Sequence, residues 1–132
     1  MKMSEGVTLI ELLLVIAIIG ILSVLSYPSY RSYMLQTRRD DAKITLIKAQ
    51  LAQSNLHIAH SYSNVADEIG LPVENLYYNF SIVSATENSY LINAIAKKSL
   101  SQGDDTLECQ TLFIDQNSHH TSDGVINNDQ CW

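Results

Sequence analysis

The chain has 132 residues, a length that fits one small domain beside the apolar stretch near its N-terminus. Hydrophobic residues make up 46% of it, and the formal net charge is −6. From residue 51 onward two lysines stand against ten acidic residues, a formal charge of −8. An acidic surface of this kind repels phosphate groups, so we do not expect nucleic acid as a partner.

The N-terminal apolar stretch dominates the sequence. No side chain from Leu12 to Leu22 is polar, and residues 7–26 as a helix would measure about 30 Å, enough to cross a bilayer. Glu11 interrupts the stretch, and a carboxylate in hydrocarbon costs at least about 2.5 kcal/mol, which indicates a function. Three other interpretations fit less well. A signal peptide would need a good cleavage site after the apolar stretch, and none is present. A plain membrane anchor does not explain Glu11, and the core helix of a soluble protein is rarely apolar on every face.

The same residues resemble the N-terminus of type IV prepilins. In that family a short polar leader ends in glycine, here Gly6, and an apolar helix follows with glutamate as its fifth residue, here Glu11. Proline comes at the family's usual distance, as Pro28. The chain departs from the pattern at Val7, where phenylalanine is usual, and in the leader, where Met3-Ser4-Glu5 precedes the glycine.

The resemblance implies processing and polymerisation. A membrane aspartic prepilin peptidase would cleave between Gly6 and Val7, and Val7 would then be N-methylated. Glu11 would pair with the new amino group of a neighbouring subunit and so fix subunit assembly, because pairing offsets the cost of two buried charges. A pair within one chain, or no pair, is the alternative. Gly20 permits close helix approach or is simply a tolerated small residue.

Helical periodicity resumes directly after Pro28, so we expect a helix kink there within one helix from about Thr8 to about His60. Residues 1–6 would be the leader, 7–27 the transmembrane and polymerisation helix, and 28–60 an amphipathic helix. Apolar residues return to one face of the amphipathic part: Tyr30, Tyr33, Thr37, Ile44, Ile47, Leu51 and Ile58. The polar faces carry Arg38, Arg39, Asp40, Asp41, Lys43 and Lys48.

Residues 61–132 predict a globular head with a connector over 61–75 and strands over 76–83, 89–96 and 107–114. We expect the apolar face of an antiparallel sheet to cover the Ile44–Ile58 stripe. The predicted fold class is therefore α+β, a type IV pilin fold in which a long N-terminal helix packs on a small antiparallel sheet with a C-terminal disulfide loop.

The last part of the head, residues 115–130, is polar and predicts a long loop. Cys109 and Cys131 fit one disulfide around it, which implies an oxidising compartment and contributes about 3 kcal/mol in the chain-entropy model. The head also resembles minor pilins of the PilE type. Its matching segments are Leu76-Tyr77, Tyr90-Leu91-Ile92, Cys109 with Leu112-Phe113-Ile114-Asp115, and Cys131-Trp132.

The sequence contains few good candidates for metal-binding or catalytic residues. His57, His60, His119 and His120 show no convergence, and zinc needs three or four ligands. Asp123, Asn127 and Asp129 are weak Ca²⁺ ligand candidates, suggested by a resemblance to pseudopilins that use calcium in a C-terminal loop; a loop without metal is preferred. No nucleophilic triad or phosphate loop is present, so we expect neither a cofactor nor an enzyme.

The sequence thus predicts a minor pilin that supports pilus assembly and pilus-dependent adhesion, twitching motility or DNA uptake. The alternatives are a major pilin, a type II secretion pseudopilin, or a DNA-binding competence pilin, for which only Lys97-Lys98 offers basic residues in the head. The expected location is the bacterial inner membrane, single-pass with the head outside the cytoplasm, and then the pilus fibre. Basic residues after the span contradict that orientation by the positive-inside rule, but the disulfide and the resemblance favour export.

Overall fold

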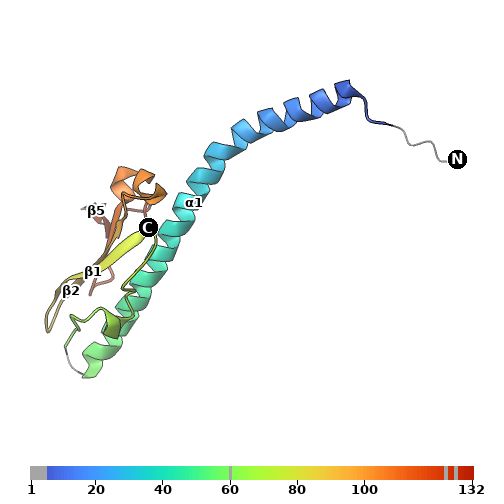
Figure 1. Cartoon of the computed structure of the whole chain (residues 1–132). Helices are drawn as coiled ribbons and strands as arrows, with labels where there is room; N and C mark the ends of the chain where they lie inside the picture. Colours follow the sequence, from blue (N-terminus) through green and yellow to red (C-terminus); the bar gives the residue numbers. More distant parts are fainter. Residues whose placement is uncertain (1–5, 60, 124, 127) are drawn as a thin grey trace. The chain divides into compact units, whose positions relative to one another are not determined.

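The computed structural model describes residues 6–59, 61–123, 125–126 and 128–132. The chain forms two compact units, Met1–Met34 and Leu35–Trp132. One helix, α1 (Leu9–Ala59), supplies most of the first unit and continues into the second (Figure 1). This confirms the long N-terminal helix, and Pro28 lies inside it.

The first unit is apolar and its side chains are exposed. Helix α1 is long and apolar enough, in its N-terminal part, to cross a membrane, and none of that apolar part is buried. Ser23 and Ser26 turn their hydroxyls inward and donate to the carbonyls of Ile19 and Leu22, at 2.7 and 2.8 Å. Such bonds hide hydroxyl donors from a lipid environment, so these serines do not interrupt the apolar character of the segment.

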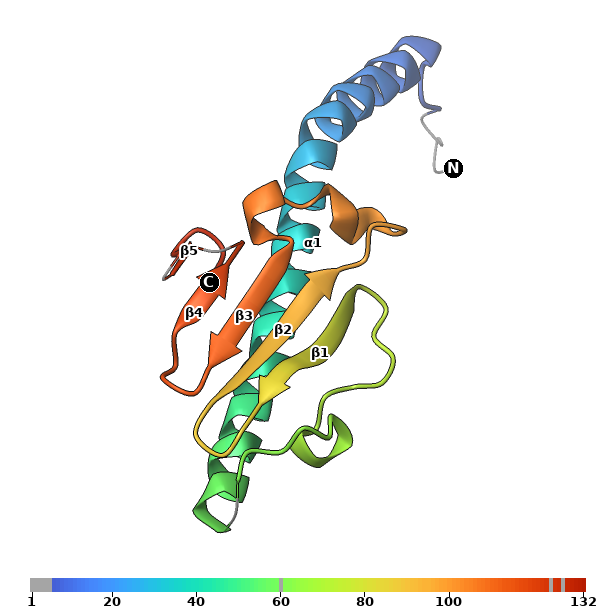
Figure 2. The ribbon, with the colours of Figure 1, turned by 90° about the vertical axis from the view of Figure 1, so that its left-hand side faces the viewer.

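The second unit contains one antiparallel sheet in which each strand pairs with the next along the chain (Figure 2). Its strands are β1 (Tyr78–Ala85), β2 (Tyr90–Ala96), β3 (Thr111–Asp115), β4 (His120–Ser122) and β5 (Val125–Ile126). The register places Ala94 of β2 between Phe80 and Leu112, and Leu112 opposite Ser122. A bulge interrupts β1 between Ile82 and Ser84. Short turns join β1 to β2, β3 to β4 and β4 to β5, as antiparallel neighbours allow, whereas a longer connection with two 3₁₀ turns joins β2 to β3.

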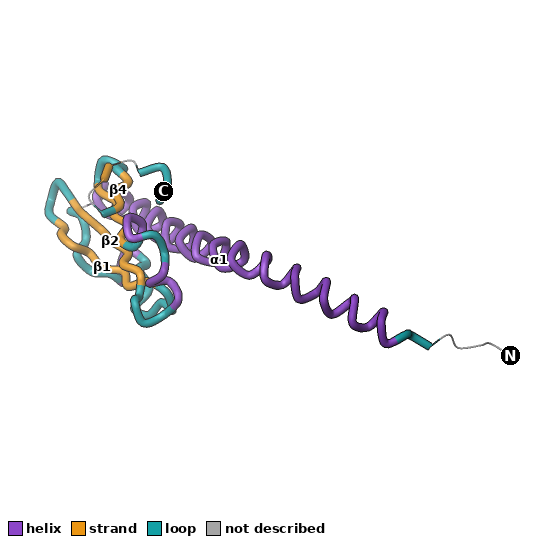
Figure 3. The backbone as a smooth tube through the Cα atoms, turned by 90° about the horizontal axis from the view of Figure 1, so that it is seen from above, coloured by secondary structure: helices purple, strands orange, loops and turns teal. Residues whose placement is uncertain are grey.

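The core of this unit lies between the sheet and the part of α1 that follows Leu35. The strands lie together on one side of that part of the helix (Figure 3). Alternate residues of the central strands point inward, and Ile92, Ala94, Leu112 and Ile114 are completely buried. This two-residue alternation is the pattern expected of a sheet with one covered face.

The helix presents a different face to the sheet from the one that the sequence indicated. Its buried residues are Arg39, Ala42, Leu46, Ala49 and Gln53. By contrast, the expected stripe is exposed, with Ile44 at 50%, Ile47 at 47% and Leu51 at 63%. The expectation that the sheet covers the Ile44–Ile58 stripe is therefore wrong. Two small alanines let the helix approach the sheet closely, while the larger isoleucines lie about half a turn away.

Several boundaries in the head also differ from expectation. The connector contains a 3₁₀ turn, Asp67–Ile69, which Gly70 ends in the left-handed region at φ 69°. The third strand begins at Thr111 instead of residue 107, because Leu107–Cys109 forms a 3₁₀ turn. The expected loop over 115–130 contains β4 and β5, whose hydrogen bonds to β3 and to each other compensate for a polar composition. The disulfide between Cys109 and Cys131 is present and both cysteines are buried.

Candidate functional site

The N-terminus of α1 is closed by a reciprocal pair of hydrogen bonds between Thr8 and Glu11. The Glu11 carboxylate accepts bonds from the backbone N–H and the hydroxyl of Thr8, both at 2.9 Å. In return, the Glu11 N–H donates to the Thr8 hydroxyl at 3.3 Å. This is a capping box, which satisfies two of the free N–H groups at a helix start. The Thr-x-x-Glu spacing signals it, and our sequence reasoning missed that signal.

The remaining residues expected to act in processing lie beside this cap. Gly6 and Val7 are exposed and precede the helix. Apart from chain neighbours and the helix's own backbone, no described heavy atom lies within 4 Å of the position that a Cβ would take at Gly6 or at Gly20. Pro28 lies within the helix and lacks an N–H, so one carbonyl of the preceding turn loses its helical partner. Cleavage and methylation at Gly6–Val7, assembly through Glu11 and the kink at Pro28 stay predictions.

The weak calcium candidates are not brought together as a described site. Asp123 and Asp129 are exposed, and Asn127 lies outside the described residues. Among the residues that the structure describes, no group of three His, Cys, Asp or Glu side chains is placed to hold a metal. The histidines have other contacts: His57 stacks on Tyr62 at 4.1 Å, and His120 on Trp132 at 4.4 Å between ring centroids. His60 lies outside the described residues.

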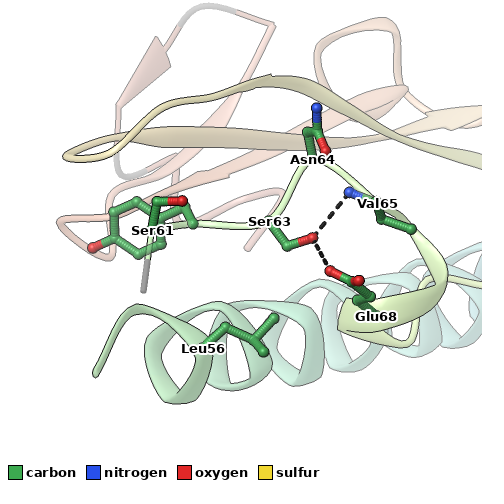
Figure 4. A pocket seen from close by; sticks show the side chains of 7 residues that line it. Leu56, Ser61, Ser63, Asn64, Val65 and Glu68 are labelled. Carbon is green, nitrogen blue, oxygen red and sulfur yellow. Dashed lines mark hydrogen bonds between the residues drawn. The ribbon is translucent and has the colours of Figure 1, made fainter. Parts of the chain in front are cut away.

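A pocket of about 420 Å³ opens where the connector leaves the end of α1 (Figure 4). Ser63 lies at its centre and its hydroxyl bonds to the Glu68 carboxylate and accepts from the N–H of Val65. Buried Gln53 fixes Ser63 from the helix side through two bonds to its backbone, at 2.6 and 2.8 Å. These bonds hold the connector in place, and they engage the polar groups of Ser63, Val65 and Glu68 in the pocket lining.

A cluster of basic and aromatic side chains lies on another part of the second unit. The Arg38 guanidinium carbon lies 3.9 Å from the centre of the Tyr77 ring, and its Nη1 donates to the Ser101 hydroxyl at 2.6 Å. Lys97 reaches the same neighbourhood: its backbone N–H donates to the carbonyl of Tyr77 at 2.8 Å. Lys98 follows and is exposed. We call Arg38, Tyr77, Lys97 and Lys98 the Tyr77 patch.

Arg39, in contrast, belongs to the interior and not to a polar outer face as expected. Its Nε lies 3.4 Å from Oδ2 of Asp105, and the two side chains are 11% and 4% exposed. Burial raises the pKa of the Asp105 carboxyl, although the nearby Arg39 charge opposes this rise. Burial, with the Asp105 charge, also raises the pKa of Tyr78 to about 12. Gln102 joins the two by donating to the Tyr78 hydroxyl at 2.9 Å.

The folded chain is similar to a solved pilin structure. It matches the crystal structure of the Neisseria meningitidis non-core minor pilin PilV with a TM-score of 0.56 and 12% sequence identity. The match covers 71% of this chain and 91% of that one. At this level of identity the likeness establishes the fold, and it confirms the predicted type IV pilin fold.

Two family models match the sequence in adjoining ranges. Residues 1–27 match the prokaryotic N-terminal methylation motif. Residues 28–113 match the family described as type IV minor pilin ComP, DNA uptake sequence receptor. The second match covers more than half of the chain, so the chain belongs to this family of type IV minor pilins. No curated protein matches the chain. Membership confirms a minor pilin and a non-enzymatic protein.

Proposed function

We propose that this chain is a DNA-uptake minor pilin, in which the pilus carries the head as a receptor for DNA. The observation that carries the proposal is the family match over residues 28–113, which includes most of the head and bears the description of a DNA uptake sequence receptor. This favours DNA uptake over adhesion and twitching motility. It also reverses our expectation from the net charge, because phosphate binding depends on the local potential and not on the total.

The match to the N-terminal methylation motif supports processing of the chain as a prepilin. We propose that cleavage follows Gly6, that Val7 is methylated, and that the apolar part of α1 anchors the protein in the inner membrane before assembly. The exposed apolar side chains of the first unit support this, since about twenty such residues suit hydrocarbon or other apolar helices. Partners would be other pilin subunits and the prepilin peptidase.

The exposed stripe on the later part of α1 supports assembly as well. Ile44, Ile47 and Leu51 are each about half exposed or more, and they lie away from the sheet. Exposed apolar residues in a row on one helix face indicate an interaction surface. We propose that neighbouring subunits cover this face in the fibre, so that the head's own core and the assembly surface occupy opposite sides of one helix.

DNA uptake provides the decisive test. A strain that lacks this chain should still assemble pili, but its uptake of fluorescent duplex DNA and its transformation frequency should both be low. Expression of the wild-type chain should restore uptake and transformation. The purified full chain in detergent should bind duplex DNA with an affinity that falls as salt rises. Normal uptake in the deletion strain, together with no DNA binding by the purified chain, would refute the proposal.

A further inference from the structure

The acidic head offers few places for a phosphate group, and its free cations decide where such a group can lie. From residue 51 onward Lys97 and Lys98 are the only basic residues. Among the four basic residues of α1 after Leu35, Arg39 is buried against Asp105 and Lys43 contacts Asp40 at 2.9 Å. Lys48 is exposed further along α1, so Arg38 and the two neighbouring lysines are the remaining basic residues to consider near Tyr77.

Arg38 and Lys97 come together because of the fold, and Lys98 follows Lys97 in the sequence. Arg38 and Lys97 are far apart in sequence, yet both contact Tyr77, one through the ring and the other through the backbone. Lys97 Nζ also donates to the Asn75 carbonyl at 2.6 Å. An ammonium group has three donors, so this bond leaves two for another acceptor. The arrangement holds the Lys97 side chain in place while leaving it able to bind an anion.

A groove lies beside Lys97. It has a volume of about 630 Å³ and is lined by Val73, Glu74, Asn75, Leu76, Lys97, Ser99 and Leu100. Val73 is 91% exposed and Leu76 63% exposed, so apolar side chains stand in solvent directly beside positive charge. A nucleic acid backbone matches both features, because phosphates alternate with apolar sugar edges. Glu74 is the one acidic residue in this lining and would oppose a phosphate.

We propose that the Tyr77 patch and this groove form the DNA contact of the head, with Lys97 and Lys98 on phosphates and Leu76 against sugar. The inference rests on the proposed function and adds its site. Two or three neutralised phosphates give a slope of log K against log salt of about −2 to −3, since each contributes about −0.9. The contact positions the duplex and carries no sequence information by itself.

Lys98 is the residue to change, because it is exposed and Lys97 also supports the fold. The full chain in detergent is titrated with fluorescent duplex DNA at several salt concentrations. We expect Lys98→Gln to weaken binding several-fold and to reduce the salt slope by about 1. Glu74→Gln should strengthen binding, because it removes the repulsive charge. Lys48→Gln, an exposed lysine elsewhere on α1, should leave affinity and slope unchanged.

The outcomes distinguish a failure of the site assignment from a failure of the proposed function. If the wild-type chain binds DNA and the Lys98 and Glu74 variants bind with the same affinity and slope, the site assignment is wrong and the proposed function stands. Equal losses in Lys98→Gln and Lys48→Gln would also overturn the assignment, since binding would then follow net charge. If the wild-type chain does not bind, the site assignment fails, and normal DNA uptake in the deletion strain would then refute the proposed function as well. Circular dichroism of each variant confirms that the fold is retained.

Discussion

The Nε atom of Arg39 lies 3.4 Å from Oδ2 of Asp105, and this pair joins α1 to the segment that precedes the disulfide. Arg39 also donates from Nη1 to the Gln130 carbonyl at 3.3 Å. One helical side chain thus contacts a residue shortly before Cys109 and the residue directly before Cys131. Because it is almost buried, the pair contributes to stability mainly by avoiding an isolated charge in the interior.

Removing Arg39 should therefore destabilise the head in a pH-dependent manner. Arg39→Met leaves Asp105 buried without its partner, and we expect a loss of about 3 kcal/mol in the free energy of unfolding at pH 7. The substitution raises the pKa of Asp105 further. For a carboxyl group whose pKa is higher in the folded chain than in the unfolded chain, the favourable contribution to folding is complete at a pH below the unfolded pKa. That contribution is lost as the pH rises through the folded pKa. The loss should thus be smaller at pH 4 than at pH 7.

Urea unfolding of the full chain in detergent, followed by tyrosine and tryptophan fluorescence, measures this difference. Lys48→Met is the control, because it removes a positive charge from an exposed position on the same helix. It should change stability by less than about 1 kcal/mol at either pH. An equal loss for Arg39→Met at both pH values would contradict the role assigned to the pair.

Two adjacent residues test which face of α1 meets the sheet. Leu46 is completely buried and Ile47 is 47% exposed. Leu46→Ala should lower the free energy of unfolding by about 3 kcal/mol, since it leaves a cavity in the core, whereas Ile47→Ala should cost less than about 1 kcal/mol. If Ile47 stabilises the fibre as we propose, its variant should instead reduce recovery in sheared pili. Similar unfolding losses for both variants would show that the assignment of the faces is wrong.

The disulfide should provide much of the stability of the C-terminal segment. Cys109 and Cys131 are separated by 22 residues, and a loop of that length corresponds to about 3 kcal/mol in the chain-entropy model. The double variant Cys109→Ala, Cys131→Ala should unfold at lower urea, and reductant should have no effect on it. The wild-type chain in reductant should approach the stability of this variant, and no change on reduction would contradict the estimate.

The hydrogen bonds between Thr8 and Glu11 allow charge and helix capping to be separated in the assembly proposal. Glu11→Gln removes the charge but keeps a side chain that suits a capping box, whereas Thr8→Ala removes the cap and keeps the charge. If Glu11 pairs with the amine of a neighbouring subunit, Glu11→Gln should be missing from sheared pili and Thr8→Ala should be present. The reverse result would assign Glu11 to capping alone.

Gly103 supports the turn that presents Lys98. A Cβ at this position would lie 2.7 Å from the Lys98 Cα, which is a backbone atom and cannot move aside cheaply. Gly103→Ala should therefore destabilise the head by about 1–3 kcal/mol and weaken DNA binding. Gly20→Ala is the matched control, because outside its chain neighbours and its own helix backbone the added Cβ would meet no described atom within 4 Å. This variant should leave unfolding of the head unchanged. Equal stability of the two variants would contradict the prediction.

The sequence predicts the long helix, the antiparallel strands and the disulfide correctly, because each depends on local pattern or on pairing of two cysteines. The sequence indicates the wrong face of α1 for packing on the sheet, because two faces of that helix are candidates. The larger aliphatic residues, such as Ile47 and Leu51, mark the exposed one. The buried face includes Arg39 and Gln53, which are tolerated only because Asp105 and Ser63 supply partners from distant segments.

The short strands and the basic cluster escape prediction for a similar reason. β4 consists of three polar residues, and its pairing with β3 rather than its composition makes it a strand. The lysines at 97 and 98 were recognised as the only basic residues of the head, but an averaged charge of −8 outweighed them. The proximity of Arg38 and Lys97 to Tyr77 is a property of the folded chain alone.

The start of α1 at Leu9 has a consequence for proteolysis. The Gly6–Val7 peptide bond lies before the first helical turn, in chain without helical hydrogen bonds. A peptidase acting there would meet substrate that needs no unwinding, and the leader could depart while Thr8 and Glu11 keep their mutual bonds. Cleavage would then shorten the polypeptide without shortening α1, so the precursor and the mature protein would have the same helix for insertion in the membrane.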